Sequence, residues 1–405
     1  MIAYYVLAVV VAVWQLLTLY IGGRHFFYVL KKYRPVSRSY KPRTALIAPC
    51  KGIDTTFERN VNALFELDYP DYEIIFVVDG TSDPAYEVLR RLIEGQKDKV
   101  NPKARLIVAG VAEHCSQKIH NLLAGWDVLE DDFDVLAFID SDVCPKRHWL
   151  SSLVGPLKRK SVGASTGYRL YVPADSRLSS QVLSAANALI ASTLGPHKWN
   201  AAWGGSMAIK RELAERIQLR RAWRFSGVDD YTLTAAVRKA DLRIYYVPAC
   251  LVASYDRMSW SQLFSFAKRQ FIITRVCMSA LWKLALFHFS AYVVVFWSSV
   301  LFTAHLVAVR SGDWRGAALL PVFIALVSAL KAALRHLLVM KILPEDRTKL
   351  ALPAVIDIFC QPLLAVFTLV SLIASATTRK IIWRGVGYYL HSPTRAEIIH
   401  LPRRI

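Results

Sequence analysis

Apolar stretches long enough to cross a lipid bilayer lie near both ends of this 405-residue chain and constrain its fold most strongly. One covers residues 2–21 without a charged side chain, and three more cover about residues 284–308, 317–340 and 351–375. A run of about 20 apolar residues can span the hydrocarbon core as a helix, because a helix satisfies its own backbone there. Residues 44–255 instead have the composition of a soluble domain. The sequence therefore predicts an anchor, a globular domain and a membrane bundle, in that order.

The charges beside these stretches predict their orientation. No basic residue precedes the first stretch, no small-x-small cleavage site follows it, and the first acidic residue of the chain is Asp54. This favours a retained anchor over a cleaved signal peptide, and the positive-inside rule places the globular domain in the cytoplasm of a multi-pass membrane protein. The expected segments are an anchor (1–22), a basic linker (23–43), the globular domain (44–255), an interfacial helical region (256–283), the membrane bundle (284–375) and a basic tail (376–405).

The basic tail leaves one point of this topology open. If the fourth apolar stretch spans the membrane, residues 376–405 lie outside, against the charge rule. The alternative is a re-entrant segment, which the irregularities Pro353, Asp357 and Pro362 favour. A similar choice concerns the apolar helical stretch 182–194, which either lies in the core of the globular domain or turns toward the membrane, since periodicity does not separate the two.

The excess of basic residues does not indicate a nucleic-acid-binding protein. The formal net charge is +20, but much of it lies beside the apolar stretches, where it sets topology and meets anionic lipid. No zinc-finger spacing or RNA-binding signature accompanies it. The six cysteines are scattered without a C-x-x-C pair, which favours reduced thiols over a disulfide framework. The expected partner is the lipid bilayer, and no nucleic acid is expected to bind.

Short β-rich runs alternate with helix-length segments in the globular domain. Buried strands are predicted at 44–48, 73–78, 105–108 and 135–139, and helices at 56–65 and 84–94. This alternation predicts an α/β fold with βαβ units and a mostly parallel, Rossmann-like sheet. Asp79 and Asp140 each directly follow a predicted strand, so both are expected in the crevice beyond the carboxyl ends of the sheet.

Two carboxylates one residue apart, Asp140 and Asp142, follow the strand at 135–139. Their hard oxygen atoms are ligands that suit Mg²⁺ or Mn²⁺, and such an ion can hold a phosphate. A triplet of this kind is common by chance, so its weight depends on the motifs around it.

With five further motifs, this triplet resembles family 2 glycosyltransferases and, within them, the ceramide-glucosyltransferase-like branch. The motifs in chain order are Ala48-Pro49-Cys50-Lys51-Gly52, Val78-Asp79, Ser116-Gln117-Lys118-Ile119-His120-Asn121-Leu122, Asp140-Ser141-Asp142, Gly204-Gly205-Ser206 and Asp229-Asp230-Tyr231. The resemblance implies a GT-A-type cytoplasmic domain with one N-terminal and about three C-terminal transmembrane helices. It implies inverting transfer of a hexose from a UDP-sugar to the hydroxyl of a membrane lipid, with a ceramide-like or a hopanoid-like acceptor.

The same resemblance assigns the residues of the donor side. Asp79 is implied near the base and ribose, and Asp140 with Asp142 as ligands of Mg²⁺ or Mn²⁺, which would neutralise the leaving diphosphate. Lys118 is implied beside the donor, and side-chain-free backbone at Gly204 and Gly205 lets the chain approach a sugar closely. The other donor-side candidates are Pro49, Lys51, Asn121 and Ser206.

Asp229 and Asp230 are the candidate catalytic carboxylates. Direct displacement at the anomeric carbon needs a carboxylate to take the proton from the acceptor hydroxyl. Two adjacent acids repel each other, which raises the pKa of one of them. The resemblance makes Asp230 the base and puts Asp229 where the family often has Glu.

One motif departs from the family pattern. The family commonly carries Gln-x-x-Arg-Trp on an interfacial helix, whereas residues 266–270 read Phe-Ala-Lys-Arg-Gln. Arg269 is retained and, with Arg275, is expected to meet the diphosphate. Gln270 occupies the position of the missing Trp and is a further candidate for substrate binding.

Two alternative functions make different demands on the sequence. A processive polysaccharide synthase predicts the full Gln-x-x-Arg-Trp motif and more membrane helices than the four apolar stretches provide. A non-catalytic membrane protein with a degenerate nucleotide-sugar-binding domain predicts loss of the metal or base carboxylates, yet Asp140, Asp142 and Asp230 are present. Both alternatives are therefore less favoured than the transferase.

Overall fold

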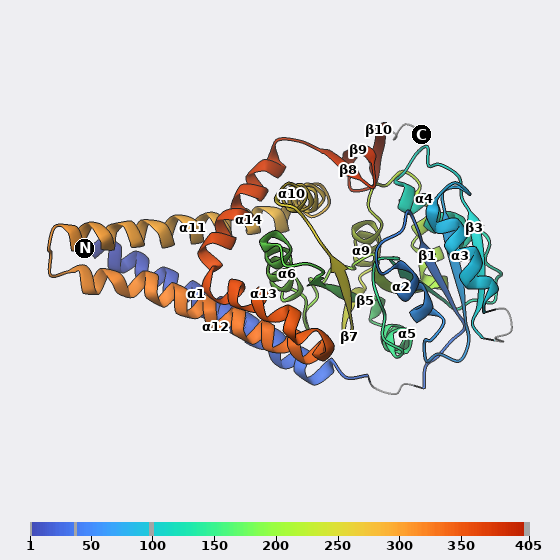
Figure 1. The fold of residues 1–405 in the computed structure, drawn as a ribbon, viewed down its shortest axis with the longest axis horizontal. Helices are drawn as coiled ribbons and strands as arrows, with labels where there is room; N and C mark the ends of the chain where they lie inside the picture. Colours follow the sequence, from blue (N-terminus) through green and yellow to red (C-terminus); the bar gives the residue numbers. More distant parts are fainter. Residues whose placement is uncertain (1, 36–38, 97–100, 401–405) are drawn as a thin grey trace. The chain divides into compact units, whose positions relative to one another are not determined.

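The computed structural model describes residues 2–35, 39–96 and 101–400, which divide into two compact units (Figure 1). The helical unit comprises the first helix up to Leu30, together with Tyr171–Thr193 and Asp256–Thr378. The sheet unit comprises the described residues of Lys31–Leu170, Leu194–Tyr255 and Arg379–Ile405. Neither unit is one continuous segment, because the chain passes between them repeatedly.

A seven-stranded sheet in the order β3-β2-β1-β4-β6-β5-β7 forms the centre of the sheet unit. Its strands are β1 (Thr44–Pro49), β2 (Tyr72–Val78), β3 (Lys103–Val108), β4 (Val135–Ile139), β5 (Val162–Pro173), β6 (Ser206–Lys210) and β7 (Arg243–Asp256). The strands β1 to β4 pair in parallel, whereas β6 pairs antiparallel with β4 and with β5. The predicted α/β class with a mostly parallel sheet is confirmed.

All four predicted strands form, as β1 to β4, but one of them is not buried. Residues 44–48 and 135–139 are buried throughout, and Leu46 and Ala48 pack into the core on one face of the sheet. Ala45 and Ile47 pack on the other face, as the two-residue period of a strand requires. Burial of residues 105–108 was predicted and is wrong: β3 lies at the sheet edge beside β2 alone, and Val108 is 46% exposed.

Helices cover both faces of this sheet. They are α2 (Phe57–Leu64), α3 (Pro84–Glu94), α4 (Gln117–Asp127), α5 (Trp149–Val154), α7 (Arg211–Arg216), α8 (Leu219–Trp223) and α9 (Asp229–Lys239), with the 3₁₀ turn η1 (Gly155–Lys158). The first two match the predicted helices at 56–65 and 84–94. Asp83 caps α3 by accepting a hydrogen bond of 2.8 Å from the Ala85 N–H, which satisfies a donor that the first turn leaves unpaired.

The helical unit is built from long apolar helices that lie alongside one another (Figure 1). Its helices are α1 (Ile2–Lys32), α6 (Leu178–Ala191), α10 (Trp260–Cys277), α11 (Ser279–Ala308), α12 (Trp314–Ile342), α13 (Arg347–Phe359) and α14 (Gln361–Ala376), with the 3₁₀ turn η2 (Pro344–Asp346). In the part of the chain described, α1, α11 and α12 are long and apolar enough to cross a membrane. The fourth predicted stretch is a pair of helices, α13 and α14, bent by 86° at the break between them.

The apolar helix α6 belongs to the helical unit. Val182, Leu183 and Ala185 pack in one cluster with Leu263 of α10 and Ile356 of α13. Residues 182–193 of this stretch therefore lie with the apolar helices, whereas Leu194 belongs to the sheet unit.

The predicted basic tail is folded. It forms a three-stranded antiparallel sheet of β8 (Lys380–Trp383), β9 (Val386–Ser392) and β10 (Arg395–His400) in the sheet unit. Val386, Tyr388 and Leu390 alternate along β9 as its buried side chains. This period of two was the local signal for a strand, and the surrounding basic residues concealed it.

The helix pair α13–α14 has the geometry of a broken membrane span or of a re-entrant loop, the two alternatives that the sequence left open. The small sheet of β8 to β10 belongs to the sheet unit. The side of the membrane on which the tail lies stays a prediction.

Candidate active site

The carboxyl ends of β1 and β2 bring a lysine and an aspartate together. The Cys50 N–H donates to the Val77 carbonyl at 2.8 Å, which holds the end of β1 against β2. Lys51, which follows β1, forms an ion pair with Asp79, which follows β2. The adjoining loop turns at Gly52, whose φ is +69° and whose N–H donates to Asp83 at 2.9 Å. The predicted neighbours Pro49, Lys51 and Asp79 thus occupy one edge of the sheet, as parallel strands require.

Lys118 connects the carboxylates of β4 and α9. Its Nζ lies 2.7 Å from Asp140 Oδ1 and 3.0 Å from Asp229 Oδ2, and its side chain is 11% exposed. Ser116 caps α4 and accepts from the Ile119 N–H, which fixes the turn that carries Lys118. Burial alone would lower the pKa of Lys118, but the two carboxylates raise it well above its ordinary value. Lys118 therefore remains a cation at neutral pH.

Asp140 and Asp142 each face a cation. Burial acts to raise the pKa of Asp140, but Lys118, Arg169 and Arg384 outweigh it and the pKa is lowered. Arg169 Nη1 lies 2.9 Å from Asp142 Oδ2. Asp140 is therefore ionised at neutral pH, as a metal ligand must be.

These two carboxylates fit a divalent metal held jointly with a substrate. Asp142 Oδ1 is buried and has no hydrogen-bond partner among the residues that the structure describes. Within the same described ranges, no group of three or more His, Cys, Asp and Glu side chains is arranged to hold a metal. Mg²⁺ is commonly bound by one or two carboxylates, with substrate phosphates and water as the other ligands. Asp140 and Asp142 match that donor set.

Gly204 and Gly205 lie against the charged groups with no room for a side chain. A Cβ on Gly204 would lie 2.7 Å from Lys118 Nζ, and one on Gly205 would lie 2.7 Å from Asp140 Oδ2. Real Cβ atoms almost never approach other heavy atoms so closely. A side chain at either position would displace these charged groups, so glycine lets the backbone pass beside Lys118 and Asp140 without moving them.

Asp230 has no cation within ion-pair distance in the described chain and differs from the other carboxylates in this respect. Its Oδ2 accepts from the Gly204 N–H at 3.1 Å, and its Oδ1 accepts from the Tyr231 N–H at 2.7 Å. Burial and the neighbouring charge of Asp229 raise the pKa of Asp230 to about 7, against the opposing effect of Lys118. A carboxylate with a pKa near neutrality is suited to accept a proton at neutral pH.

Two predicted donor-side residues are engaged within the fold. Asn121 is 2% exposed, donates to the Val77 carbonyl at 3.3 Å and accepts from Gln117 Nε2 at 2.8 Å. Ser206 is fully buried, and its Oγ accepts from Trp149 Nε1 at 2.9 Å. These contacts hold α4 and β6 in place behind Lys118 and Gly205.

The predicted residues of the interfacial helix lie on α10, in the helical unit. Arg269 stacks on the Phe266 ring at 5.4 Å, and Arg275 donates to the Thr378 carbonyl at 2.5 Å. The Gln270 carbonyl accepts from Thr274 Oγ1 at 2.9 Å. These three contacts are made inside that unit.

Arg169 and Trp203, which no local sequence pattern marks as site residues, complete one side of the cluster. The Arg169 guanidinium pairs with Asp142 and lies 5.2 Å from the centroid of the Trp203 ring. Tyr168 packs edge-on against the same ring, and burial raises its pKa to about 12. These residues come from β5 and from the segment before β6, which meet only because the two strands pair.

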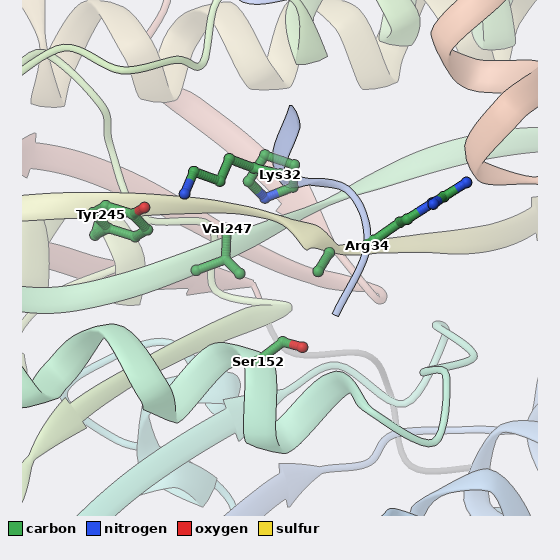
Figure 2. A pocket seen from close by; sticks show the side chains of 7 residues that line it. Lys32, Arg34, Ser152, Tyr245 and Val247 are labelled. Atoms are coloured by element: carbon green, nitrogen blue, oxygen red, sulfur yellow. The ribbon is translucent and has the colours of Figure 1, made fainter. Parts of the chain in front are cut away.

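A separate pocket in the sheet unit contains none of the predicted site residues. Its lining is Lys32, Arg34, Ser152, Tyr245, Val247, Pro248 and Ala249. Figure 2 shows Tyr245 and Val247 on one strand, with Lys32 and Arg34 on a segment that passes beside it. The carboxylates and Lys118 are therefore a distinct site.

Comparisons with known proteins agree with the motif order. The model of the family described as Glycosyl transferase family 21 matches residues 1–396. A ceramide glucosyltransferase from Komagataella phaffii is 28% identical over 162 residues, which are 38% of this chain and 31% of that protein. The chain thus matches about a third of that relative's length. The predicted resemblance to the ceramide-glucosyltransferase-like branch is confirmed.

Solved structures with weaker similarity also include sugar transferases. A mannosyltransferase from Pyrobaculum calidifontis in complex with GDP-Man and Mn²⁺ is 18% identical, with a TM-score of 0.49, and the match covers 92% of this chain and 97% of that one. A GalNAc-T7 structure with UDP, GalNAc and Mn²⁺ is 13% identical, with a TM-score of 0.41, and covers 55% of this chain and 45% of that one.

Proposed function

Because this chain belongs to glycosyltransferase family 21, we propose that it transfers a hexose from a UDP-sugar to the hydroxyl of a membrane lipid, with inversion at the anomeric carbon. The observation that carries this proposal is that two carboxyl groups of one site have pKa values shifted in opposite directions. Asp230 has a pKa raised to about 7, while the nearby Asp140 has a lowered pKa. One carboxylate is suited to take up a proton and the other to keep its charge.

Asp230 is the proposed general base. It takes the proton from the acceptor hydroxyl as the acceptor oxygen bonds to the anomeric carbon and the bond to the diphosphate breaks. The hydrogen bonds from the Gly204 and Tyr231 N–H groups fix the carboxylate in one orientation. Asp229 anchors Lys118 and keeps the pKa of Asp230 high through its charge. A single displacement needs no covalent intermediate on the protein, so no further nucleophile is required.

The donor side is proposed to bind the diphosphate between the cations and the metal carboxylates. Asp140 and Asp142 would hold Mg²⁺ or Mn²⁺, which when bound supplies Lewis-acid stabilisation of the departing phosphate charge. Lys118 places a fixed positive charge beside the same groups, and Gly204 and Gly205 let the backbone approach the sugar. Lys51 and Asp79 at the neighbouring strand ends are proposed to contact the nucleoside. Asn121 and Ser206 support the elements that carry these groups.

A lipid acceptor is supported by the membrane helices and by the likeness to a ceramide glucosyltransferase. The acceptor class is a lipid with one accessible hydroxyl, ceramide-like or hopanoid-like. The basic residues that follow α1 support a cytoplasmic position for the sheet unit. Arg269, Gln270 and Arg275 on α10 are proposed to contribute to substrate binding from the helical unit.

The test is a transfer assay with the purified full-length protein in lipid nanodiscs. UDP-glucose, UDP-galactose and UDP-N-acetylglucosamine are supplied in turn with Mn²⁺, and UDP release is measured with ceramide, with a hopanoid alcohol and without acceptor. We expect lipid-dependent UDP release with one donor and a product of inverted anomeric configuration by NMR. Retention of configuration would contradict the role of Asp230. Release that is independent of every lipid, combined with growth of a polysaccharide, would favour a synthase instead.

A further inference from the structure

The turn between β8 and β9 has a conformation that its residues do not favour. Trp383 pairs with Val386, so Arg384 and Gly385 form a two-residue hairpin loop. Their φ angles are +48° and +80°. Turns of this type favour Asn-Gly or Gly-Gly, because Gly and Asn tolerate a positive φ. Most other residues with a Cβ, such as arginine, are strained there. Residues held in such a strained backbone conformation often lie at functional sites, so the contacts of Arg384 bear on function.

The hairpin is fixed to both elements that carry the candidate catalytic groups. The Gln117 N–H, at the start of α4, donates to the Tyr388 hydroxyl at 3.2 Å. The Ala396 N–H donates to the Phe225 carbonyl at 2.7 Å, just before α9. Gly227 is so close to this sheet that a Cβ there would lie 2.9 Å from the Ala396 Cβ. The position of the hairpin is therefore set relative to Lys118 and Asp229.

Its turn lies over the charged cluster. The Trp383 ring centroid is 5.9 Å from Lys118 Nζ, within cation–π range. Arg384 Nη2 is 3.6 Å from Asp54 Oδ2, in the loop that follows β1. The Arg384 side chain is 46% exposed. An exposed guanidinium in an ion pair of 3.6 Å is able to exchange its partner for a ligand.

We propose that the β8–β9 turn closes the donor site, with Arg384 binding the diphosphate of the nucleotide sugar and Trp383 forming the wall beside Lys118. This rests on the proposed function. The planar guanidinium matches two phosphate oxygens at once. The hairpin thus provides an arginine and an aromatic ring at the donor, whereas the interfacial helix of this chain has Gln270 where the family has Trp.

The test measures nucleotide binding by the full-length protein in nanodiscs with Mn²⁺, using UDP, GDP and uridine as probes. Arg384→Gly removes the charge and suits the positive φ, so the hairpin is retained. We expect its affinity for UDP to fall about tenfold or more, a typical loss for a charge-assisted hydrogen bond, while its affinity for uridine is unchanged. Arg384→Lys should lie between this variant and the wild type. The matched control Arg395→Ala removes an exposed charge from the same small sheet and should bind UDP as the wild type does.

Each other outcome has a definite meaning. If Arg384→Gly binds UDP as tightly as the wild type, or loses UDP and uridine equally, the diphosphate role of Arg384 is wrong. A wild type that binds neither UDP nor GDP would refute the donor assignment of the proposed function and this role with it. Binding of GDP instead of UDP would correct the nucleotide, and the comparison of GDP with guanosine then decides the role of Arg384.

Discussion

The two acidic pairs of the site, Asp140 with Asp142 and Asp229 with Asp230, have similar chemistry and different surroundings. Asp140 and Asp142 face Lys118 and Arg169 at 2.7 and 2.9 Å. In the second pair Asp229 also faces Lys118, whereas Asp230 accepts hydrogen bonds from the backbone N–H groups of Gly204 and Tyr231. Burial acts to raise the pKa of both Asp140 and Asp230, and the cations beside Asp140 reverse that effect there.

This difference shows how one site can bind an anionic donor and also accept a proton. Asp140, whose pKa is lowered by the neighbouring cations, remains ionised and can hold a metal together with Asp142. Asp230, with burial and Asp229 acting in the same direction, titrates near neutrality. The assignment of roles therefore depends on neighbours that lie far apart in the sequence, and substitutions that change one neighbour at a time test it.

The largest expected effect follows from removing the base. Asp230→Asn keeps the shape of the side chain but cannot take up the acceptor proton, so we expect kcat to fall by about 10²–10⁴-fold. UDP affinity should stay within about twofold of the wild type, because donor binding is assigned to the other pair. The assay is lipid-dependent UDP release alongside UDP binding by the same preparation.

A matched control for this variant lies beyond the other end of α9. Asp241 is exposed and has a φ of +56°, which Asn tolerates as well as Asp. Asp241→Asn should have wild-type activity. Full activity of Asp230→Asn would exclude Asp230 as the base.

The second effect concerns the first pair. Asp142→Asn removes the charge opposite Arg169 and one proposed metal oxygen, so we expect Mn²⁺-dependent UDP affinity to fall about 10–100-fold. Binding in the presence of EDTA should change much less. The surface variant Asp127→Asn, which affects only an exposed pair with Arg220, is the control. If Mn²⁺ strengthens UDP binding equally in Asp142→Asn and in the wild type, Asp142 is not a metal ligand.

Part of the site could be predicted from the sequence, because several of its residues directly follow the carboxyl ends of strands. Apolar runs predicted β1, β2 and β4, and the carboxyl ends of parallel strands lie at one edge, which predicted Asp79 and Asp140 in the same crevice. The long apolar helices were equally predictable, since their length and composition are local properties.

The rest depends on contacts between distant segments, which periodicity does not contain. Arg169 reaches Asp142 because β5 joins the sheet through β6, and no local pattern marks it. Trp383 and Arg384 lie more than 100 residues beyond α9 in the sequence, and they follow the helix pair α13–α14. The basic charges of the tail were interpreted as a signal for membrane orientation. Its folding into the sheet unit depends instead on the alternating apolar residues of β9.

A third prediction uses pH to test the coupling inside the second pair. The base must be deprotonated, so kcat/KM should fall as the pH drops below about 7. Asp229→Asn removes the like charge that raises the pKa of Asp230, and the acidic limb should move to lower pH by about one unit. The measurement is a pH profile of kcat/KM from pH 5 to 9, with Asp241→Asn as the control. An unmoved limb, or one shifted to higher pH, would contradict the role given to Asp229.

The smallest expected effect is on stability, and it tests the same pKa without catalysis. The folded-state pKa of Asp230, about 7, is raised above the unfolded value of about 4, so the folded protein holds this proton more tightly. The associated stability is complete below about pH 4 and is lost as the pH rises to 7. Asp230→Asn does not titrate and avoids this loss. Its thermal midpoint relative to the wild type should therefore be higher at pH 8 than at pH 5, by about 2–4 °C, in fluorescence melting of the full-length protein. Comparing the two pH values removes any constant effect of the amide on its contacts with Gly204 and Tyr231. A difference that is the same at both pH values would mean that burial and Asp229 do not raise this pKa, and the contrast between the two pairs would then disappear.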